Sequence, residues 1–214
     1  MSTPEKPDRI VLFLHGYGAN GDDLIDIGTY WAPSLDKTLF LSPNAPFDVE
    51  FSPLGKQWFS LGNWDPSHYG SGAVAENILN GVDVALPYLN NYIDQALSST
   101  GLTESSLVLV GFSQGAMMAI SAALSRSAPC RGVVGYSGGF VYGKPLEIRS
   151  SSPVLLVHGT DDDVIPFRAM HESAEILKTH QIPVNTLACQ NLGHGISQEG
   201  LAAGLNFIQT QFKK

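Results

Sequence analysis

The chain has 214 residues, of which 43% are apolar, and its formal net charge is -8 with a sequence pI near 5.1. This length is sufficient for one domain with a sizeable core and too short for two ordinary domains. We therefore expect a single domain over residues 1–214, with residues 1–8 flexible. The negative charge opposes binding to nucleic acid or to anionic membranes through phosphate contacts.

The start of the chain and its two cysteines suggest a cellular location. Residues 1–8 contain no apolar signal segment, and no stretch approaches the length that spans a membrane. We therefore expect a cytoplasmic protein without integral membrane association. Cys130 and Cys189 are expected to be free and buried, although a disulfide between them is conceivable.

Apolar runs alternate with helical stretches along the chain, which predicts an α/β fold, with a mostly parallel sheet covered by helices on both faces. Strands are expected at residues 9–14, 107–110, 133–136, 153–158 and 183–189, and helices beginning near residues 22, 72, 113, 167 and 197. Pro87 lies within the second helix and predicts a kink or a break there. Because only a short stretch separates the strand at 133–136 from Pro153, we expect no inserted cap domain and an open site bordered by loops.

The first strand is followed by a loop with three glycines in seven residues, at positions 15–21. Such a loop can turn backbone amides toward a ligand. It could supply a donor for an oxyanion or hold a phosphate. Neither the Walker spacing nor Gly-x-Gly-x-x-Gly is present, which disfavours a nucleotide site.

A long segment without periodic pattern runs from Ser42 to about Ser71 and carries six aromatic residues, Phe47, Phe51, Trp58, Phe59, Trp64 and Tyr69. Long loops in small domains are usually functional, so these rings could line an apolar groove for an acyl chain. Packing against the core is the alternative, and we expect it for most of them.

Ser113 lies in a Gly-x-Ser-x-Gly motif at residues 111–115, directly between a predicted strand and a predicted helix. That context is required for a serine nucleophile held on a strained turn, although such glycines can also simply pack a helix on a strand. If Ser113 is the nucleophile, the backbone N–H of Gln114 is one expected oxyanion donor, with the other supplied by the loop after the first strand.

A serine nucleophile needs a base and a carboxylate, which follow it in the order Ser, Asp or Glu, His in this architecture. Three aspartates, residues 161–163, follow the strand at 153–158; any of them could be the acid or could cap the following helix. His194 lies in a glycine-flanked loop after the strand at 183–189 and is the predicted base. His15 and His158 end strands, so we expect them to be buried and bonded to backbone.

The motifs together resemble the phospholipase/carboxylesterase family, which includes the acyl-protein thioesterases. They are Leu14–Gly18, Gly111–Gly115, the segment from His158 to Pro166, and Gly193-His194, and the resemblance extends from about Arg9 to Phe212. It implies a single-domain α/β-hydrolase fold without a cofactor. It also assigns Ser113 as nucleophile, Asp162 as acid, His194 as base, the backbone amides of Tyr17 and Gln114 as oxyanion donors, and Trp58 and Phe59 as substrate-binding residues.

These observations predict a serine carboxylesterase that forms an acyl-enzyme on a small-molecule ester. An acyl-protein thioesterase or a lysophospholipase is the nearest alternative. A ligand-binding protein that has lost catalysis is disfavoured by the complete Ser, Asp and His set, and a metal site has no ligand spacing in its favour. The oligomeric state stays open, a homodimer included.

Overall fold

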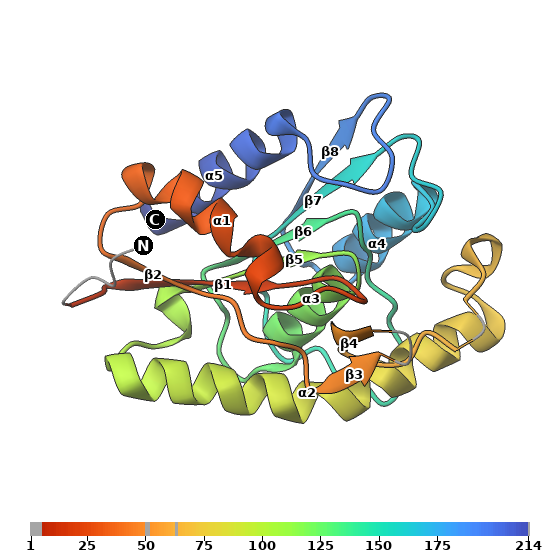
Figure 1. Cartoon of the computed structure of the whole chain (residues 1–214), viewed down its shortest axis with the longest axis horizontal. Helices are drawn as coiled ribbons and strands as arrows, with labels where there is room; N and C mark the ends of the chain where they lie inside the picture. Colours follow the sequence, from red (N-terminus) through yellow and green to blue (C-terminus); the bar gives the residue numbers. More distant parts are fainter. Residues whose placement is uncertain (1–5, 50–51, 63, 214) are drawn as a thin grey trace.

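The computed structural model describes residues 6–49, 52–62 and 64–213. Its centre is a six-stranded parallel sheet in the order β2-β1-β5-β6-β7-β8 (Figure 1). The strands are β1 (Arg9–Leu14), β2 (Thr38–Leu41), β5 (Leu107–Phe112), β6 (Gly132–Tyr136), β7 (Val154–Gly159) and β8 (Val184–Cys189). The predicted α/β class is confirmed.

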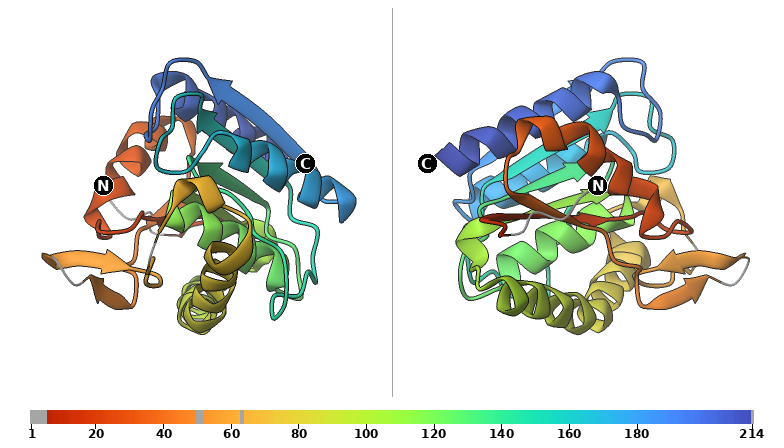
Figure 2. Two further views of the ribbon diagram at one scale, coloured as in Figure 1. Left: turned by 90° about the vertical axis from the view of Figure 1, so that its right-hand side faces the viewer. Right: turned by 60° about the vertical axis from the view of Figure 1, so that its left-hand side comes forward.

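Helices cover both faces of the sheet (Figure 2). They are α1 (Asp22–Trp31), α2 (Gly72–Thr100), α3 (Gln114–Ser125), α4 (Arg168–Thr179) and α5 (Gln198–Lys213), with short 3₁₀ turns at Ala32–Ser34, Pro66–His68 and Glu104–Ser106. One core cluster joins the sheet to α2, α3 and α4, and a second joins its other face to α1 and α5. Among the described residues, no helix combines the length and the apolar character needed to cross a membrane.

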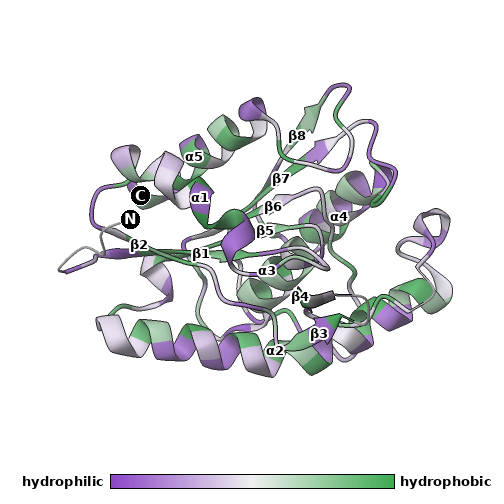
Figure 3. Cartoon of the chain, in the orientation of Figure 1, coloured by the Kyte–Doolittle hydropathy of each residue, from purple (hydrophilic) through white to green (hydrophobic). Residues whose placement is uncertain are grey.

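The two core clusters follow from the alternation of side chains along each strand. In β1, Ile10, Leu12 and Leu14 belong to the first cluster, whereas Val11 and Phe13 belong to the second. Helix α3 is buried from Gln114 to Leu124 because α2 covers its outer side. Figure 3 shows the corresponding contrast, with α3 mostly hydrophobic and α2 alternating between hydrophobic and hydrophilic residues.

Helix α2 is one helix of 29 residues that continues through Pro87, so of the predicted kink or break the break is not formed. Proline removes one backbone hydrogen bond at a cost of about 3 kcal/mol. Buried side chains on both sides of it, including Val82 and Leu89, hold the helix on the core and offset that cost.

A small antiparallel hairpin, which the sequence did not reveal, lies within the long aromatic segment. It pairs β3 (Phe47–Val49) with β4 (Ser52–Gln57) and projects beside α2 (Figure 1). Phe51 lies outside the described residues, as do residues 1–5 of the predicted flexible start. Within the described start, the Asp8 amide donates to the Lys37 carbonyl.

Both cysteines are free and buried, as predicted. The sheet also places the predicted site residues together. The loops after β1, β5, β7 and β8 all leave the carboxyl edge of a parallel sheet, which is where α/β proteins bind their ligands.

Candidate active site

Ser113 forms the turn between β5 and α3 with φ 55° and ψ -120°, a backbone conformation that L residues rarely adopt. The neighbouring strand β6 holds this turn, because the Ser113 amide donates to the Tyr136 carbonyl at 2.9 Å. The flanking glycines are required for close approach: a Cβ on Gly115 would clash with the Leu14 carbonyl, and one on Gly111 would clash with the Gly115 carbonyl. The predicted strand, turn and helix are therefore all present.

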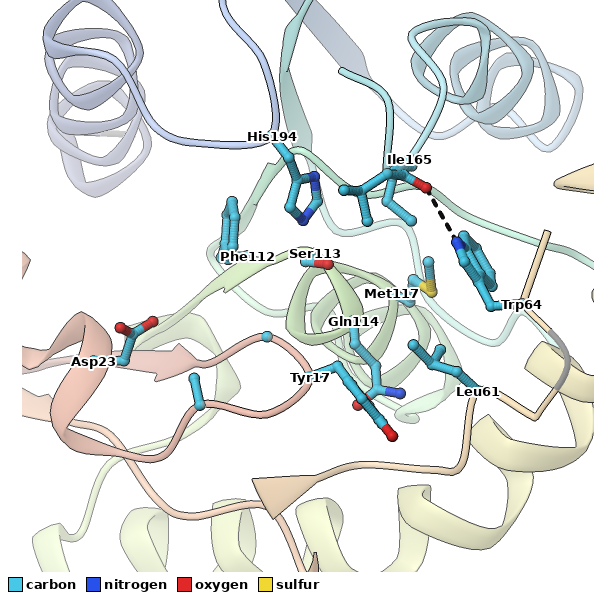
Figure 4. Close-up of a pocket in the computed structure, with 13 residues that line it drawn as sticks. Tyr17, Asp23, Leu61, Trp64, Phe112, Ser113, Gln114, Met117, Ile165 and His194 are labelled. Carbon is cyan, nitrogen blue, oxygen red and sulfur yellow. Dashed lines mark hydrogen bonds between the residues drawn. The ribbon is translucent and has the colours of Figure 1, made fainter. Parts of the chain in front are cut away.

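Ser113 is 8% exposed and faces a cavity of about 210 Å³ (Figure 4). Its walls are mainly apolar and come from the loop after β1, the segment around residue 61, the start of α3 and the loops after β7 and β8. The lining residues are Gly16, Tyr17, Ala19, Asp23, Leu61, Trp64, Phe112, Ser113, Gln114, Met117, Val164, Ile165 and His194. The cavity thus contains both the predicted nucleophile and the predicted base.

Asp162 is buried under this cavity and accepts four hydrogen bonds. Its Oδ1 accepts from the amides of Val164 (2.9 Å) and Ile165 (2.8 Å), and its Oδ2 accepts from His194 Nδ1 at 2.8 Å. Asp161 and Asp163 are exposed. Burial by itself raises the pKa of the Asp162 carboxyl, but hydrogen bonds from His158, His194 and the Ile165 amide outweigh it, so this pKa lies well below its ordinary value.

The fourth hydrogen bond to Asp162 comes from His158, whose Nε2 lies 3.2 Å from Oδ2 and 2.9 Å from the Ile165 carbonyl oxygen. His158 is 1% exposed and ends β7. The prediction of a buried, backbone-bonded histidine is confirmed, but its contact with Asp162 was missed. A histidine four residues before the acid, at a strand end, was the available signal.

His194 lies on the loop after β8, packed against the Phe112 ring with centroids 4.9 Å apart. Because Nδ1 contacts the carboxylate, Nε2 is the nitrogen left for the cavity, and Figure 4 shows the imidazole directly over Ser113. The acid and base loops pack tightly together, since a Cβ on Gly159 would clash with the Leu192 carbonyl.

The loop after β1 borders the other side of Ser113. A Cβ on Gly16 would lie 3.3 Å from the Ser113 Cβ, so the loop passes very close to the nucleophile. Tyr17 follows and lines the cavity, as does Gln114 at the first position of α3. An N–H in the first turn of a helix has no partner within that helix and is available for an anion.

Trp58 and Phe59 are 2% and 3% exposed, and neither lines this cavity. The structure therefore places these two side chains in the core and not at the cavity, where the predicted substrate-binding role would require them. They are held in the core because their backbone bonds to the Gln114 side chain: Oε1 accepts from the Trp58 amide at 2.8 Å, and Nε2 donates to the Phe59 carbonyl at 2.7 Å. Leu61 and Trp64 of the same segment line the cavity instead, and no feature of the sequence ranks them above their neighbours.

A metal centre finds no support in the described part of the chain. No group of three or more His, Cys, Asp or Glu side chains is placed there to hold an ion.

Comparison with known proteins shows the family to which the chain belongs. A family model described as phospholipase/carboxylesterase matches residues 1–212. Esterase YpfH of Escherichia coli K12 is 24% identical over 215 residues, covering 100% of this chain and 88% of the relative. Acyl-protein thioesterase 1 of Gibberella zeae is 27% identical over 217 residues, with 94% and 89% covered.

Solved structures show the same likeness in three dimensions. The crystal structure of esterase PE8 superposes with a TM-score of 0.89 at 34% identity, covering 98% of this chain and 95% of that one. The fold and the family model together lead to one conclusion. The chain belongs to the phospholipase/carboxylesterase family of α/β-hydrolases and is a hydrolase that acts on ester bonds.

Proposed function

We propose that the protein is a serine carboxylesterase that works through an acyl-enzyme on Ser113. The observation that carries this proposal is the hydrogen bond from His194 Nδ1 to the buried Asp162 carboxylate, with the imidazole in the same cavity as Ser113. A carboxylate on Nδ1 fixes the tautomer whose Nε2 can accept a proton, which is the arrangement a serine nucleophile requires.

The proposed reaction has two half-reactions. Ser113 Oγ attacks the acyl carbonyl carbon while His194 Nε2 takes the hydroxyl proton, and the Tyr17 and Gln114 amides bind the oxyanion. Collapse of this intermediate breaks the bond to the leaving group, which receives the proton from His194. Water then attacks the acyl-enzyme and gives a proton to His194. Collapse of the second intermediate breaks the bond to Ser113 Oγ, which takes that proton back from His194, and the carboxylic acid is released.

The cavity favours a short to medium acyl chain on an uncharged ester. Its volume of about 210 Å³ lies below the range of about 300–1,000 Å³ typical of drug-sized ligands. Asp23 is its exposed carboxylate, and no lysine or arginine is among the described residues that line it. Such a site lacks the cation that would neutralise a phosphate, which disfavours the lysophospholipase alternative.

An acyl-protein thioesterase remains the strongest alternative substrate assignment, because relatives bear that name. A thioester and an oxygen ester place the same acyl carbonyl beside Ser113, so the catalytic groups do not distinguish them. Parallel kcat/KM series on oxygen esters and thioesters of equal acyl length decide the matter. Higher values for oxygen esters at every length are expected for a carboxylesterase, and the reverse assigns the protein as a thioesterase.

The nucleophile itself is tested with a fluorophosphonate probe, which reacts with activated serines. The native protein should bind one probe per chain, and Ser113→Ala should bind none. Labelling that survives this substitution would exclude the proposed mechanism, and native protein that stays unlabelled would favour a ligand-binding protein without catalysis.

A further inference from the structure

The three tryptophans of the chain differ in what their indole N–H contacts. Trp58 Nε1 donates to the His15 carbonyl at 3.0 Å, across 43 residues of sequence. Trp64 Nε1 donates to the Val164 carbonyl at 3.2 Å, whereas Trp31 Nε1 is buried and has no hydrogen-bond partner among the residues that the structure describes. Trp58 is therefore the tryptophan that ties the core to the start of the loop after β1, two residues before Tyr17.

The same segment also holds this loop beyond Tyr17. The Gly18 amide donates to the Lys56 carbonyl at 2.9 Å, and the Lys56 amide donates to the Ala19 carbonyl at 2.7 Å. The approach is close enough that a Cβ on Gly55 would lie 2.7 Å from the Gly18 carbonyl oxygen. The Tyr17 amide is thus bracketed on both sides by hydrogen bonds to the end of β4 and the residues that follow it.

His15 completes the anchor on the near side. Burial lowers the pKa of the His15 imidazole, so the ring is neutral. Its Nε2 accepts a hydrogen bond from the Ala45 amide at 2.9 Å, and its Nδ1 donates to the Gly16 carbonyl at 2.8 Å. The loop after β1 is therefore held by residues 45 and 56–58 in addition to hydrogen bonds within itself.

Gln114 links this segment to the nucleophile turn. Its side chain is 1% exposed and spans the Trp58 amide and the Phe59 carbonyl, as described above. Its backbone N–H is the second proposed oxyanion donor. One continuous segment consequently contacts both elements whose amides must converge on a single oxygen atom.

We propose that residues 56–59 are a positioning element for the oxyanion hole, with Trp58 as its central residue. This inference rests on the proposed function, because it assigns the Tyr17 and Gln114 amides to the oxyanion. Donors aimed at the developing charge accelerate acyl transfer only when they are held 2.7–3.1 Å or so from the oxygen. The hydrogen bond from the Trp58 N–H sets the distance between those two donors, and the Trp58 side chain does not contact the substrate.

Trp58→Phe tests the proposal because it removes the N–H and keeps an aromatic ring in the core. Trp31→Phe is the matched control, since it makes the same change in another fully buried tryptophan whose N–H has no partner. Rates are expressed per active site titrated to completion with the fluorophosphonate, so unfolded protein does not contribute. Trp58→Phe should lower kcat on the order of 10- to 100-fold at unchanged KM. This is less than the ~10²–10³-fold loss in kcat that follows removal of a whole oxyanion donor, because the donor is displaced and not removed. Trp31→Phe should leave both constants unchanged.

A trifluoromethyl ketone provides the second readout, since Ser113 adds to its carbonyl and places an oxyanion in the hole. Its Ki should rise in Trp58→Phe by the same factor by which kcat/KM falls. Gln114→Met removes the other link while keeping side-chain length, and should give the same coupled change if Trp58→Phe fails to fold. In the double variant the losses should be less than additive, because both act on one geometry.

Two results would overturn the proposal. Equal kcat in Trp58→Phe and Trp31→Phe would show that the N–H does not position the donors. A raised KM with intact kcat would make Trp58 a wall of the substrate site. In either case Ser113-dependent labelling by the fluorophosphonate would still hold, so failure of this inference is distinguishable from failure of the proposed mechanism.

Discussion

The two sides of Ser113 are built in different ways. On one side, Asp162 and His194 are side chains on the loops after β7 and β8, joined directly by a hydrogen bond of 2.8 Å. On the other side, the proposed donors are backbone amides whose positions depend on residues 45 and 56–59. In the proposed mechanism, acid–base chemistry therefore depends on which side chains are present, and oxyanion binding depends on how distant segments pack.

The acid–base side should be the more sensitive to a single substitution. Asp162→Asn keeps the size of the side chain but removes the charge that orients the imidazole, and it should lower kcat by about 10⁴. Steady-state kinetics of Asp161→Asn and Asp163→Asn serve as controls, because both side chains are exposed and should cost far less. A large, stability-neutral loss in Asp163→Asn would mean that the acid is assigned one residue too early.

His158 offers a finer test of the same side. His158→Ala leaves Asp162 with one donor fewer, and we expect kcat to fall roughly 10- to 100-fold because small displacements of catalytic groups are costly. His158→Gln should recover most of the rate, since its amide nitrogen stands as many bonds from the backbone as Nε2. Equal kcat values in the two variants would show that the contact contributes only to folding.

The pKa of Asp162 links this side to stability. A carboxyl whose pKa in the folded state lies below its unfolded value stabilises the fold at neutral pH, and the stabilisation is lost as the pH falls through the folded pKa. The difference in unfolding free energy between the native protein and Asp162→Asn should be about 1–3 kcal/mol at pH 7. Denaturant titrations should show it shrinking below pH 4, and an equal difference at pH 7 and pH 3 would contradict the low pKa.

Trp64 tests the wall of the cavity, where the expected effect is smallest. Each buried methylene contributes about 0.8 kcal/mol at most, or roughly fourfold in kcat/KM. Trp64→Ala should flatten the rise of kcat/KM with acyl length and spare the acetyl ester. Leu54→Ala is the control, because that side chain is 75% exposed on the hairpin and does not line the cavity. Equal loss for all esters would make Trp64 a support of the loop at Val164 instead.

The sequence predicted five of the six sheet strands and the position of Ser113, because local patterns determine them, but it missed the short edge strand β2 (Thr38–Leu41). Strands are marked by apolar runs, and the turn at residues 111–115 needs its glycines for the close approach to Leu14 that the structure shows. Which aspartate contacts His194 came only from the family resemblance, since three adjacent carboxylates look alike in sequence. The role of Trp58 could not be predicted, because it depends on contacts with residues 43 and 56 positions away.

Pro87 also shows that contacts between distant residues limit what can be predicted from local sequence. Its local preference predicts a kink or a break, yet no break forms in α2 because the core contacts of the whole helix outweigh one missing hydrogen bond. Local rules are thus dependable where a motif is complete within a few residues, as around Ser113. They are overruled where distant packing decides, as along α2 and around the oxyanion loop.

The acyl-enzyme on Ser113 is the central claim, and its direct detection is the decisive measurement. Rapid mixing with a p-nitrophenyl ester, quenched in acid and followed by mass spectrometry of the intact chain and its peptides, should show one added acyl group on the peptide that contains Ser113. With an ester whose acyl-enzyme reacts slowly with water, the adduct should accumulate. It should be absent from Ser113→Ala. Turnover by Ser113→Ala at the native rate, or an acyl group on any other residue, would contradict the account.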